Sequence, residues 1–435
     1  MTPTTLVLGA GLSGLAAARA LEVQGNRCTV LERAPTVGGL TRTVSLGDYC
    51  FDYTGHFLHL AHYGTPSGVP FAGLQDDDWQ TINRESRCFV GGQLVATPIQ
   101  YRLGDLPASE RDRCIASYEA RPRHPVPETA SFRDYLIAGF GQYLADLFLI
   151  PQNEKTMATS LGRLSRDAVR RFFPAPDDAL IRQGFTNPRP AEDSSYNSRF
   201  WYPRTGGISA LVDGLRSGLA DVRVNQEVVA LDLHQHELST RDGARFRWER
   251  LYSSLPLKWL CAMTDDAELR AAAARLTHSA TVSFNLGLKA PLSDKFRGLH
   301  WIYVPDRDLP FYRVGFYSEI SPGTAAAGTS SMYVEVGVPA EQLASLDIAG
   351  DLQPRVLAAL ERLGWLDRRQ IAVLAVHVIE CAYVHHTPER ETAVSGILTQ
   401  LGQHGIVPIG RYGQWDYTSM EDSIRSGIAA VKALS

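Results

Sequence analysis

Paired cysteines, long apolar runs and clusters of positive charge are all missing from this chain of 435 residues. The six cysteines are scattered and form no Cys-x-x-Cys pair, so free thiols in a reducing compartment are expected. No apolar run approaches the roughly 18 residues that cross a bilayer. The first residues, MTPTT, lack the positive charge that precedes the apolar core of a signal peptide. We therefore expect a cytoplasmic protein without a membrane span.

Charge is balanced and evenly spread along the chain. Lys and Arg number 43 and Asp and Glu 47, a net charge of -4. Because binding of a polyanion requires clustered positive charge, nucleic acid is not expected as a partner, whereas a small anion needs only a few convergent arginines. Hydrophobic residues make up 44% and charged residues 21%, as in ordinary globular proteins. The length predicts two or three structural units of roughly 150 residues each.

A glycine-rich turn lies between two short apolar runs near the start of the chain. Residues 6–8 are apolar, Gly-Ala-Gly-Leu-Ser-Gly follows at 9–14, and an Ala/Leu-rich segment with helical spacing extends to about Val23. Residues 28–31 form a second apolar run, and Glu32 stands at its end. Strand, glycines, helix, strand and acid thus follow in the order of a dinucleotide-binding unit.

Each part of this pattern has a physical role. Gly9 permits the tight turn, Gly11 lets the backbone approach a pyrophosphate, and Gly14 lets helix and strand pack closely. The N-terminus of the helix offers unpaired N–H groups to that pyrophosphate. Glu32 lies close to the offset of about 20 residues expected of a carboxylate that accepts from ribose hydroxyls. An acid there favours FAD or NAD over NADP.

Two adjacent glycines, Gly38 and Gly39, follow Glu32 and bear on the choice between FAD and NAD. They resemble the extended loop of the flavoprotein superfamily that includes amine oxidases and protoporphyrinogen oxidase, whereas ordinary NAD dehydrogenases lack this loop. FAD is therefore the expected cofactor, and a plain loop is the alternative. The resemblance implies that FAD is bound by Gly9, Gly11, Gly14, Glu32, Arg33, Gly38, Gly39, Leu40, Gly55, His56, Val228, Gly410, Arg411, Met420, Glu421, Asp422 and Ser423.

The segments beyond residue 200 predict a return to the cofactor domain. A helix is expected over 203–219 and an alternating strand over 227–233, whose backbone near Val228 holds the adenine end of FAD in the resembling superfamily. Ser419 and Asp422 have capping-box spacing and begin a C-terminal helix. Superfamily members aim the N-terminus of such a helix at the pyrimidine edge of the flavin, where it stabilises reduced flavin.

The fold expected from these patterns is α/β: a discontinuous Rossmann-type FAD-binding domain, a helical insert domain and a mixed or antiparallel β-sheet substrate domain. Helical periodicity covers roughly 108–173, and β-branched and aromatic alternation covers 277–382. A buried strand is expected over 406–409. The expected domains are 1–75 with 200–265 and 385–435 for FAD, 100–199 for a helical substrate gate, and 76–99 with 266–384 for the substrate sheet.

Further sequence blocks resemble one family within that superfamily. They read Tyr-Thr-Gly-His at 53–56, Thr-Pro-Ile-Gln at 97–100, Asp-Leu-Phe-Leu-Ile-Pro-Gln-Asn-Glu-Lys at 146–155, Trp-Ile-Tyr-Val-Pro at 301–305 with Pro-Phe-Tyr-Arg at 310–313, and Gly-Arg-Tyr-Gly-Gln-Trp-Asp-Tyr at 410–417. The blocks are similar to those of the UDP-galactopyranose mutases, and to the eukaryotic-type branch more than to the bacterial one. Their order and rough spacing hold over nearly the whole chain.

This resemblance implies a flavin-dependent isomerase without net redox change, in which galactopyranose and galactofuranose rings interconvert on a UDP-sugar. The flavin must be reduced, by an external donor such as NADPH or NADH, so that its N5 atom can attack the anomeric carbon. His56, Arg313 and Arg411 are the implied catalytic residues, and the two arginines pair with the diphosphate. The implied substrate contacts are Gln100, Asn153, Tyr303, Arg313, Tyr383, Arg411 and Tyr417.

Two departures from the family leave the nucleotide and the sugar open. Met157 occupies the position of a family tryptophan, and the aromatic residue that stacks on uracil has no clear counterpart. An oxidase or dehydrogenase of the amine oxidase or protoporphyrinogen oxidase type is the alternative function, and a non-catalytic FAD-binding scaffold is a third. His56, His59 and His62 recur every third residue, but no cysteine or carboxylate stands at ligand spacing, so no metal is expected.

Overall fold

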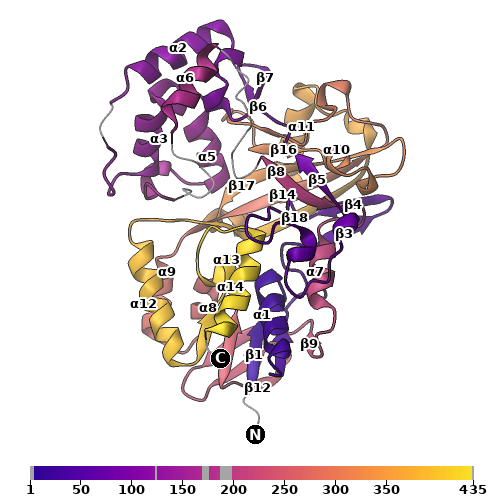
Figure 1. The fold of residues 1–435 in the computed structure, drawn as a ribbon, viewed down its shortest axis with the longest axis vertical. Coiled ribbons are helices and arrows are strands. Elements are labelled where there is room, and N and C mark those ends of the chain that lie inside the picture. The colour runs from indigo at the N-terminus through magenta and orange to yellow at the C-terminus, as the bar shows by residue number, and fades with distance from the viewer. Residues whose placement is uncertain (1–3, 123–124, 169–175, 187–197, 434–435) are drawn as a thin grey trace.

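A computed structural model describes residues 4–122, 125–168, 176–186 and 198–433 of the chain. Figure 1 shows a sheet-and-helix unit that holds the first and last of the described residues, a long central sheet above it, and a group of helices at the far end. The predicted fold class, α/β with a discontinuous Rossmann-type domain, a helical insert and a mixed sheet, is confirmed. Residues 169–173 of the expected helical region lie outside the described residues.

The Rossmann-type sheet is parallel throughout and combines distant parts of the chain. Its order is β19 (Ile406–Pro408), β13 (Arg250–Ser253), β1 (Thr5–Leu8), β2 (Cys28–Leu31) and β9 (Val222–Arg223). Both faces are buried: Val7 joins the core on one face, and Leu6 and Leu8 join the core on the other. The short apolar runs of the sequence are therefore strands buried on both sides, as parallel strands usually are.

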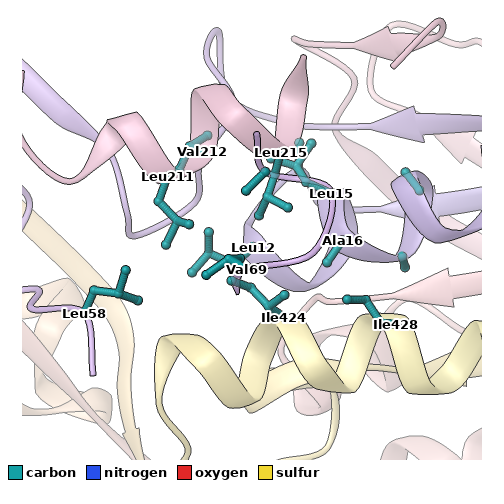
Figure 2. Packing of buried hydrophobic residues seen from close by; sticks show 14 of the residues in the cluster. Leu12, Leu15, Ala16, Leu58, Val69, Leu211, Val212, Leu215, Ile424 and Ile428 are labelled. Carbon is teal, nitrogen blue, oxygen red and sulfur yellow. The ribbon is translucent and has the colours of Figure 1, made fainter. Parts of the chain in front are cut away.

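Helix α1 (Leu12–Val23) lies between α7 (Ser209–Arg216) and α14 (Met420–Lys432), as Figure 2 shows. Leu12, Leu15 and Ala16 of α1 are buried against Leu211 of α7 and Ile424 of α14. This packing puts α1 and α14 on the same face of the sheet. The other face is covered by α8 (Leu257–Ala262), α9 (Ala267–Ala274) and α12 (Arg390–Gln403).

The central sheet has seven strands and is antiparallel except where β15 pairs with β6. Helix α11 (Gln353–Arg362) packs on one face of it. The order is β18 (Ile371–Val384), β14 (His278–Leu288), β17 (Ser330–Pro339), β16 (Arg313–Gly315), β15 (Trp301–Tyr303), β6 (Ser86–Val90) and β7 (Gln93–Ala96). Smaller sheets pair β3 (Thr43–Leu46) with β4 (Tyr49–Asp52), β5 (Trp79–Asn83) with β8 (Arg199–Pro203), and β10 (Val228–Asp232), β11 (Glu237–Thr240) and β12 (Arg245–Arg247) with one another.

The helical insert lies at the far end of the central sheet (Figure 1), and it shares its core with β6 and β7 of that sheet. Its helices include α2 (Ala108–Glu119), α3 (Phe132–Phe140), α4 (Gln142–Leu144), α5 (Ile150–Met157) and α6 (Asp178–Thr186). Tyr303, Tyr383 and Tyr417 pack against this core from outside the insert. The Met157 carbonyl lies 2.8 Å from Nε2 of His385, which joins the end of α5 to the segment after β18.

Two elements differ from their expected lengths. The helix expected over 203–219 is only Ser209–Arg216, because Gly206 and Gly207 have φ values of 78° and 71°, outside the helical region. The strand expected over 406–409 is Ile406–Pro408. The capping box of Ser419 and Asp422 is confirmed at the start of α14. Within the described ranges, no helix has both the length and the apolar content of a membrane span.

Candidate functional site

A cavity of about 650 Å³ extends from the β1–α1 turn to the central sheet. Gly9 and Gly11 border one end, and Tyr303 and Arg313 border the other. Its volume is in the usual range of ligand-binding pockets. Among the described residues, the lining comes from 8–59 and 226–423, and none of it comes from the insert.

Two glycine loops lie against each other at the first end of the cavity. The Gly38 N–H donates to the Ala10 carbonyl at 2.8 Å, which holds the second loop on the β1–α1 turn. Gly38 and Gly39 have φ values of 112° and 57°, and a Cβ atom on Gly39 would come within 3.3 Å of the Gly11 Cα atom. The loops therefore present bare backbone to the cavity, as close approach to a phosphate requires.

The carboxylate of Glu32 braces the same turn. It is buried and accepts from the Ala10 N–H at 2.8 Å and from the Ala34 N–H at 2.9 Å. Each carboxylate oxygen can accept a further hydrogen bond, so a ribose hydroxyl can still be bound there. Arg33 lines the cavity beside it, 3.3 Å from Glu380 and 5.7 Å from the centre of the Trp259 ring.

The loop that follows β4 carries Gly55 and His56 along the cavity wall. Its base is fixed by Asp52, whose buried carboxylate accepts from the Thr43 hydroxyl at 2.6 Å and from the Tyr202 hydroxyl at 2.8 Å. Burial raises the pKa of Asp52 to about 6, and both of these hydrogen bonds oppose that rise. The buried carboxylate thus anchors the loop to β3 and β8.

His56 is an uncharged imidazole at neutral pH. Burial, together with the charges of Arg411 and Arg313, lowers its pKa to about 4, while Glu335 acts in the opposite direction. The three charged groups are therefore neighbours of this ring. A neutral imidazole can hold a ligand as donor or acceptor without adding charge.

At the sheet end, Arg313 on β16 faces Glu335 on the adjacent strand β17. Its Nε atom donates to Oε2 at 2.6 Å and its Nη2 atom to Oε1 at 2.8 Å, a bidentate ion pair. The Glu335 side chain is 1% exposed and that of Arg313 is 16% exposed. The Arg313 guanidinium is thus fixed in one plane at the cavity wall.

Arg411 lies in a cage of tyrosine rings. Its guanidinium carbon is 4.4 Å from the centre of the Tyr417 ring and 5.4 Å from the ring centres of Tyr383 and Tyr412. Its Nη2 atom donates to the Ala382 carbonyl at 2.7 Å. In the described part of the chain, no carboxylate lies within ion-pair distance of Arg411, and its buried Nε atom has no hydrogen-bond partner. This positive charge is available to an anion in the cavity.

The N-terminus of α14 borders the cavity through Ser419, Met420 and Ser423. Glu421, in the same turn, does not line the cavity. Its completely buried carboxylate accepts from the N–H groups of residues 61, 62 and 63 at 3.0, 2.8 and 2.7 Å. The sequence predicts that Glu421 contacts the cofactor. In the structure it instead fixes the loop after His59.

Replacing Glu421 with glutamine is expected to lower the free energy of unfolding by about 2–3 kcal/mol, because three backbone N–H groups lose a charged acceptor. Denaturant unfolding measures this loss. The matched control is Glu391→Gln, at the corresponding exposed position in the first turn of α12, which should change stability by less than about 0.5 kcal/mol. Equal, small effects of the two substitutions would contradict the role of Glu421.

The cavity brings together most, but not all, of the residues that the sequence singled out. Those that line it are Gly9, Gly11, Glu32, Arg33, Gly38, Gly39, Leu40, Gly55, His56, Val228, Tyr303, Arg313, Tyr383, Arg411, Tyr417, Met420 and Ser423. Gly14, Gly410, Glu421 and Asp422 lie behind the lining, where they pack or cap α1 and α14.

Gln100 and Asn153 lie outside the cavity lining, in the insert and its approach. Gln100 is buried, and the amide of Asn153 donates to the Leu149 carbonyl of its own helical segment at 2.7 Å. In this arrangement neither side chain reaches the ligand space. Over the described residues, no group of three or more His, Cys, Asp and Glu side chains is arranged to bind a metal ion.

Two groups at the sheet end were missed by the sequence analysis. Glu335 breaks the apolar run of β17, and an acid inside a buried strand is the signal that could have identified it. Trp301 lines the cavity with a buried Nε1 atom that has no hydrogen-bond partner among the described residues. Its ring stacks on Phe57 at 5.1 Å between centres, so it joins the His56 loop to β15.

Comparison with known proteins agrees with this architecture. Residues 7–67 match the family model of the NAD(P)-binding Rossmann-like domain. A crystal structure of reduced UDP-galactopyranose mutase is 24% identical, with a TM-score of 0.89 over 100% of this chain and 94% of that chain. A putative protoporphyrinogen oxidase from Exiguobacterium sp. 255-15 is 16% identical, with a TM-score of 0.78 over 100% of this chain and 99% of that chain. Cyclohexylamine oxidase from Brevibacterium oxydans IH-35A is 13% identical, with a TM-score of 0.67 over 100% of this chain and 99% of that chain.

These likenesses span the whole chain, from the Rossmann-type unit through the insert and the central sheet. At identities below 25% they concern the arrangement of the backbone and leave the chemistry to the residues of the cavity. The chain thus has the fold shared by a UDP-galactopyranose mutase and several oxidases.

Proposed function

We propose that this protein is an FAD-dependent nucleotide-sugar mutase of the cytoplasm that interconverts pyranose and furanose rings, with UDP-galactopyranose as the leading substrate. The observation that carries the proposal is the sheet end of the cavity. Arg411, which has no carboxylate partner among the described residues, lies there in a tyrosine cage, and Arg313 lines the same end of the cavity. A diphosphate is the anion that such a pair of arginines recognises best. The block at 410–417 supports placement in the eukaryotic-type branch.

The other end of the cavity fits FAD. Bare backbone at Gly11 and Gly39 and the N-terminus of α1 suit a pyrophosphate, and Glu32 can accept from a ribose hydroxyl. The second loop at Gly38 is the feature that favours FAD over NAD. When bound and reduced by a donor such as NADPH or NADH, FAD would supply the nucleophilic N5 atom for the anomeric carbon.

The side chains of the cavity would then bind and orient the sugar nucleotide. Arg313 and Arg411 hold the diphosphate, and the hydroxyls of Tyr303, Tyr383 and Tyr417 donate to it. This arrangement keeps the leaving group close to the anomeric carbon, so that it can return after the ring has reclosed. The neutral His56 ring holds the flavin side of the site without adding charge.

We propose that the insert at 100–199 gates entry to this site. Its core packs directly on Tyr303, Tyr383 and Tyr417, so motion of the insert would uncover the substrate end. A contact of Gln100 or Asn153 with the substrate requires such a motion, because neither lines the cavity as it stands.

An oxidase of amines or of an apolar substrate is the alternative that the shared fold permits. The charge at Arg411 argues against it, because an unneutralised guanidinium repels an ammonium group and is costly beside an apolar ligand. A non-catalytic FAD scaffold would not need two arginines converging on its cavity.

The test is an anaerobic assay of the purified holoprotein with UDP-galactopyranose, UDP-galactofuranose and other nucleotide sugars. Each substrate is incubated with dithionite-reduced and with oxidised protein, and the products are separated by chromatography. We expect ring interconversion with reduced flavin only. Turnover of an amine or of oxygen, with every nucleotide sugar untouched, would replace the proposal with the oxidase.

A further inference from the structure

We infer that Glu335 is a positioning residue that orients Arg313, ties it to the loop carrying His56 and sets the charge of the substrate end of the cavity. The inference rests on the proposed function, since it assumes that an anion binds there. Glu335 lies in the middle of β17 and is completely buried. A buried carboxylate in the centre of a sheet is costly unless it is paired.

Orientation follows from the bidentate pair. Both oxygens of Glu335 are used by Arg313, one by Nε and one by Nη2, so the guanidinium can neither rotate nor withdraw. The two residues stand directly opposite each other on adjacent strands, which fixes their backbones as well. The edge of the guanidinium that Glu335 does not use, at Nη1, remains for a ligand.

The same carboxylate also contacts the loop that carries His56. The Gly55 N–H donates to Oε1 of Glu335 at 3.4 Å. The loop lies directly on β17, because a Cβ atom on Gly55 would come within 2.4 Å of the Tyr333 hydroxyl. Glu335 thus joins the arginine of the substrate end to the loop of the cofactor end, and it holds both at a fixed separation.

Glu335 also sets the net charge at the sheet end of the cavity. Glu335 neutralises Arg313, so in the described residues Arg411 is the one cavity arginine at the sheet end without a carboxylate partner. A diphosphate therefore meets one net positive charge instead of two. This limits how tightly the diphosphate binds, and a product that must leave in every cycle benefits from that limit.

The test compares UDP binding with turnover. In Glu335→Gln the countercharge is lost and one acceptor oxygen is kept, so the dissociation constant of UDP, titrated by calorimetry into oxidised holoprotein, should fall about tenfold. The value of kcat should fall about 10–100-fold, because the guanidinium is no longer fixed. A merely structural role predicts weaker binding and loss of flavin instead.

Two variants separate charge from geometry. Glu335→Asp keeps the charge but is too short for the bidentate pair, so UDP should bind within about threefold of wild type while kcat falls. Glu237→Gln, which removes the partner of two ion pairs outside the cavity lining, should leave both quantities unchanged. If Glu335→Gln does not fold, the double variant Glu335→Gln/Arg313→Gln replaces it, because it leaves no unpaired charge. This double variant should bind flavin but bind UDP at least tenfold more weakly than wild type.

The outcomes distinguish this inference from the proposed function. If wild-type protein binds neither UDP nor pyrophosphate, both are overturned. If wild type binds UDP but Glu335→Gln binds it equally or more weakly, only the role of Glu335 is overturned. If UDP binds more tightly to Glu335→Gln although no sugar ring is interconverted by wild type, the mutase fails and the role of Glu335 stands.

Discussion

Replacing Arg411 with methionine is expected to lower kcat/KM for the nucleotide sugar about 10²–10³-fold, the usual effect of removing one preorganised donor from a developing negative charge. Methionine fills much of the space of the side chain without its charge. The tyrosine cage would remain, but its rings would surround an uncharged group. The loss of activity arises in the step in which the diphosphate leaves the sugar, because the negative charge of the diphosphate increases in that step.

The measurement is the initial rate with reduced protein, divided by the concentration of bound FAD. Arg216→Met is the matched control: Arg216 donates to the Leu219 carbonyl at 2.9 Å, outside the cavity lining. Its loss should change kcat/KM by less than threefold. Arg411→Lys should recover only part of the activity, since a lysine cannot donate to the Ala382 carbonyl and to a diphosphate in the same plane.

Undiminished activity of Arg411→Met would show that the sugar nucleotide binds elsewhere. A loss confined to KM would assign Arg411 to uniform binding of the diphosphate, whereas a loss in kcat assigns it to the step in which the leaving group separates. The second pattern is the expected one, because the cage keeps the guanidinium in place before substrate arrives.

The end of the cavity at the β1–α1 turn was predictable because its signals are local in the sequence. Gly9, Gly11 and Glu32 fall within one strand–helix–strand unit, where the spacing alone dictates which atoms meet. Gly38 and Gly39 follow a few residues later and fold back on the same turn. The structure places all five at the cavity wall.

The other contacts of the site were less accessible to such reasoning because they join distant segments. Nothing in the spacing of Glu421 shows that it binds the loop at 61–63, about 360 residues earlier. The pairing of Glu335 with Arg313 depends on the register of two strands. The match of the insert block to a family motif placed Asn153 in the site, but the packing of the insert places it outside the lining.

Replacing Gly14 with alanine is expected to abolish FAD retention and to lower the free energy of unfolding by about 3 kcal/mol. A Cβ atom at this position would lie 1.9 Å from the Gly9 carbonyl oxygen and 3.1 Å from its carbon. Both neighbours are backbone atoms of the turn, so relief requires α1 to move away from β1. The same movement displaces the backbone that would hold the pyrophosphate, and a loss of about 3 kcal/mol of binding free energy would weaken FAD binding about 100-fold.

The control is the same substitution in another helix. Gly396 lies within α12 and is exposed, and a Cβ atom added to it would meet no atom within 4 Å, so Gly396→Ala should raise stability by up to about 1 kcal/mol. Flavin absorbance per protein and denaturant unfolding measure both effects. Because alanine favours a helix at either position, the opposite signs isolate the approach of Gly14 to Gly9. Wild-type flavin content in Gly14→Ala would mean that the turn does not hold the pyrophosphate, and the cofactor assignment would fail with it.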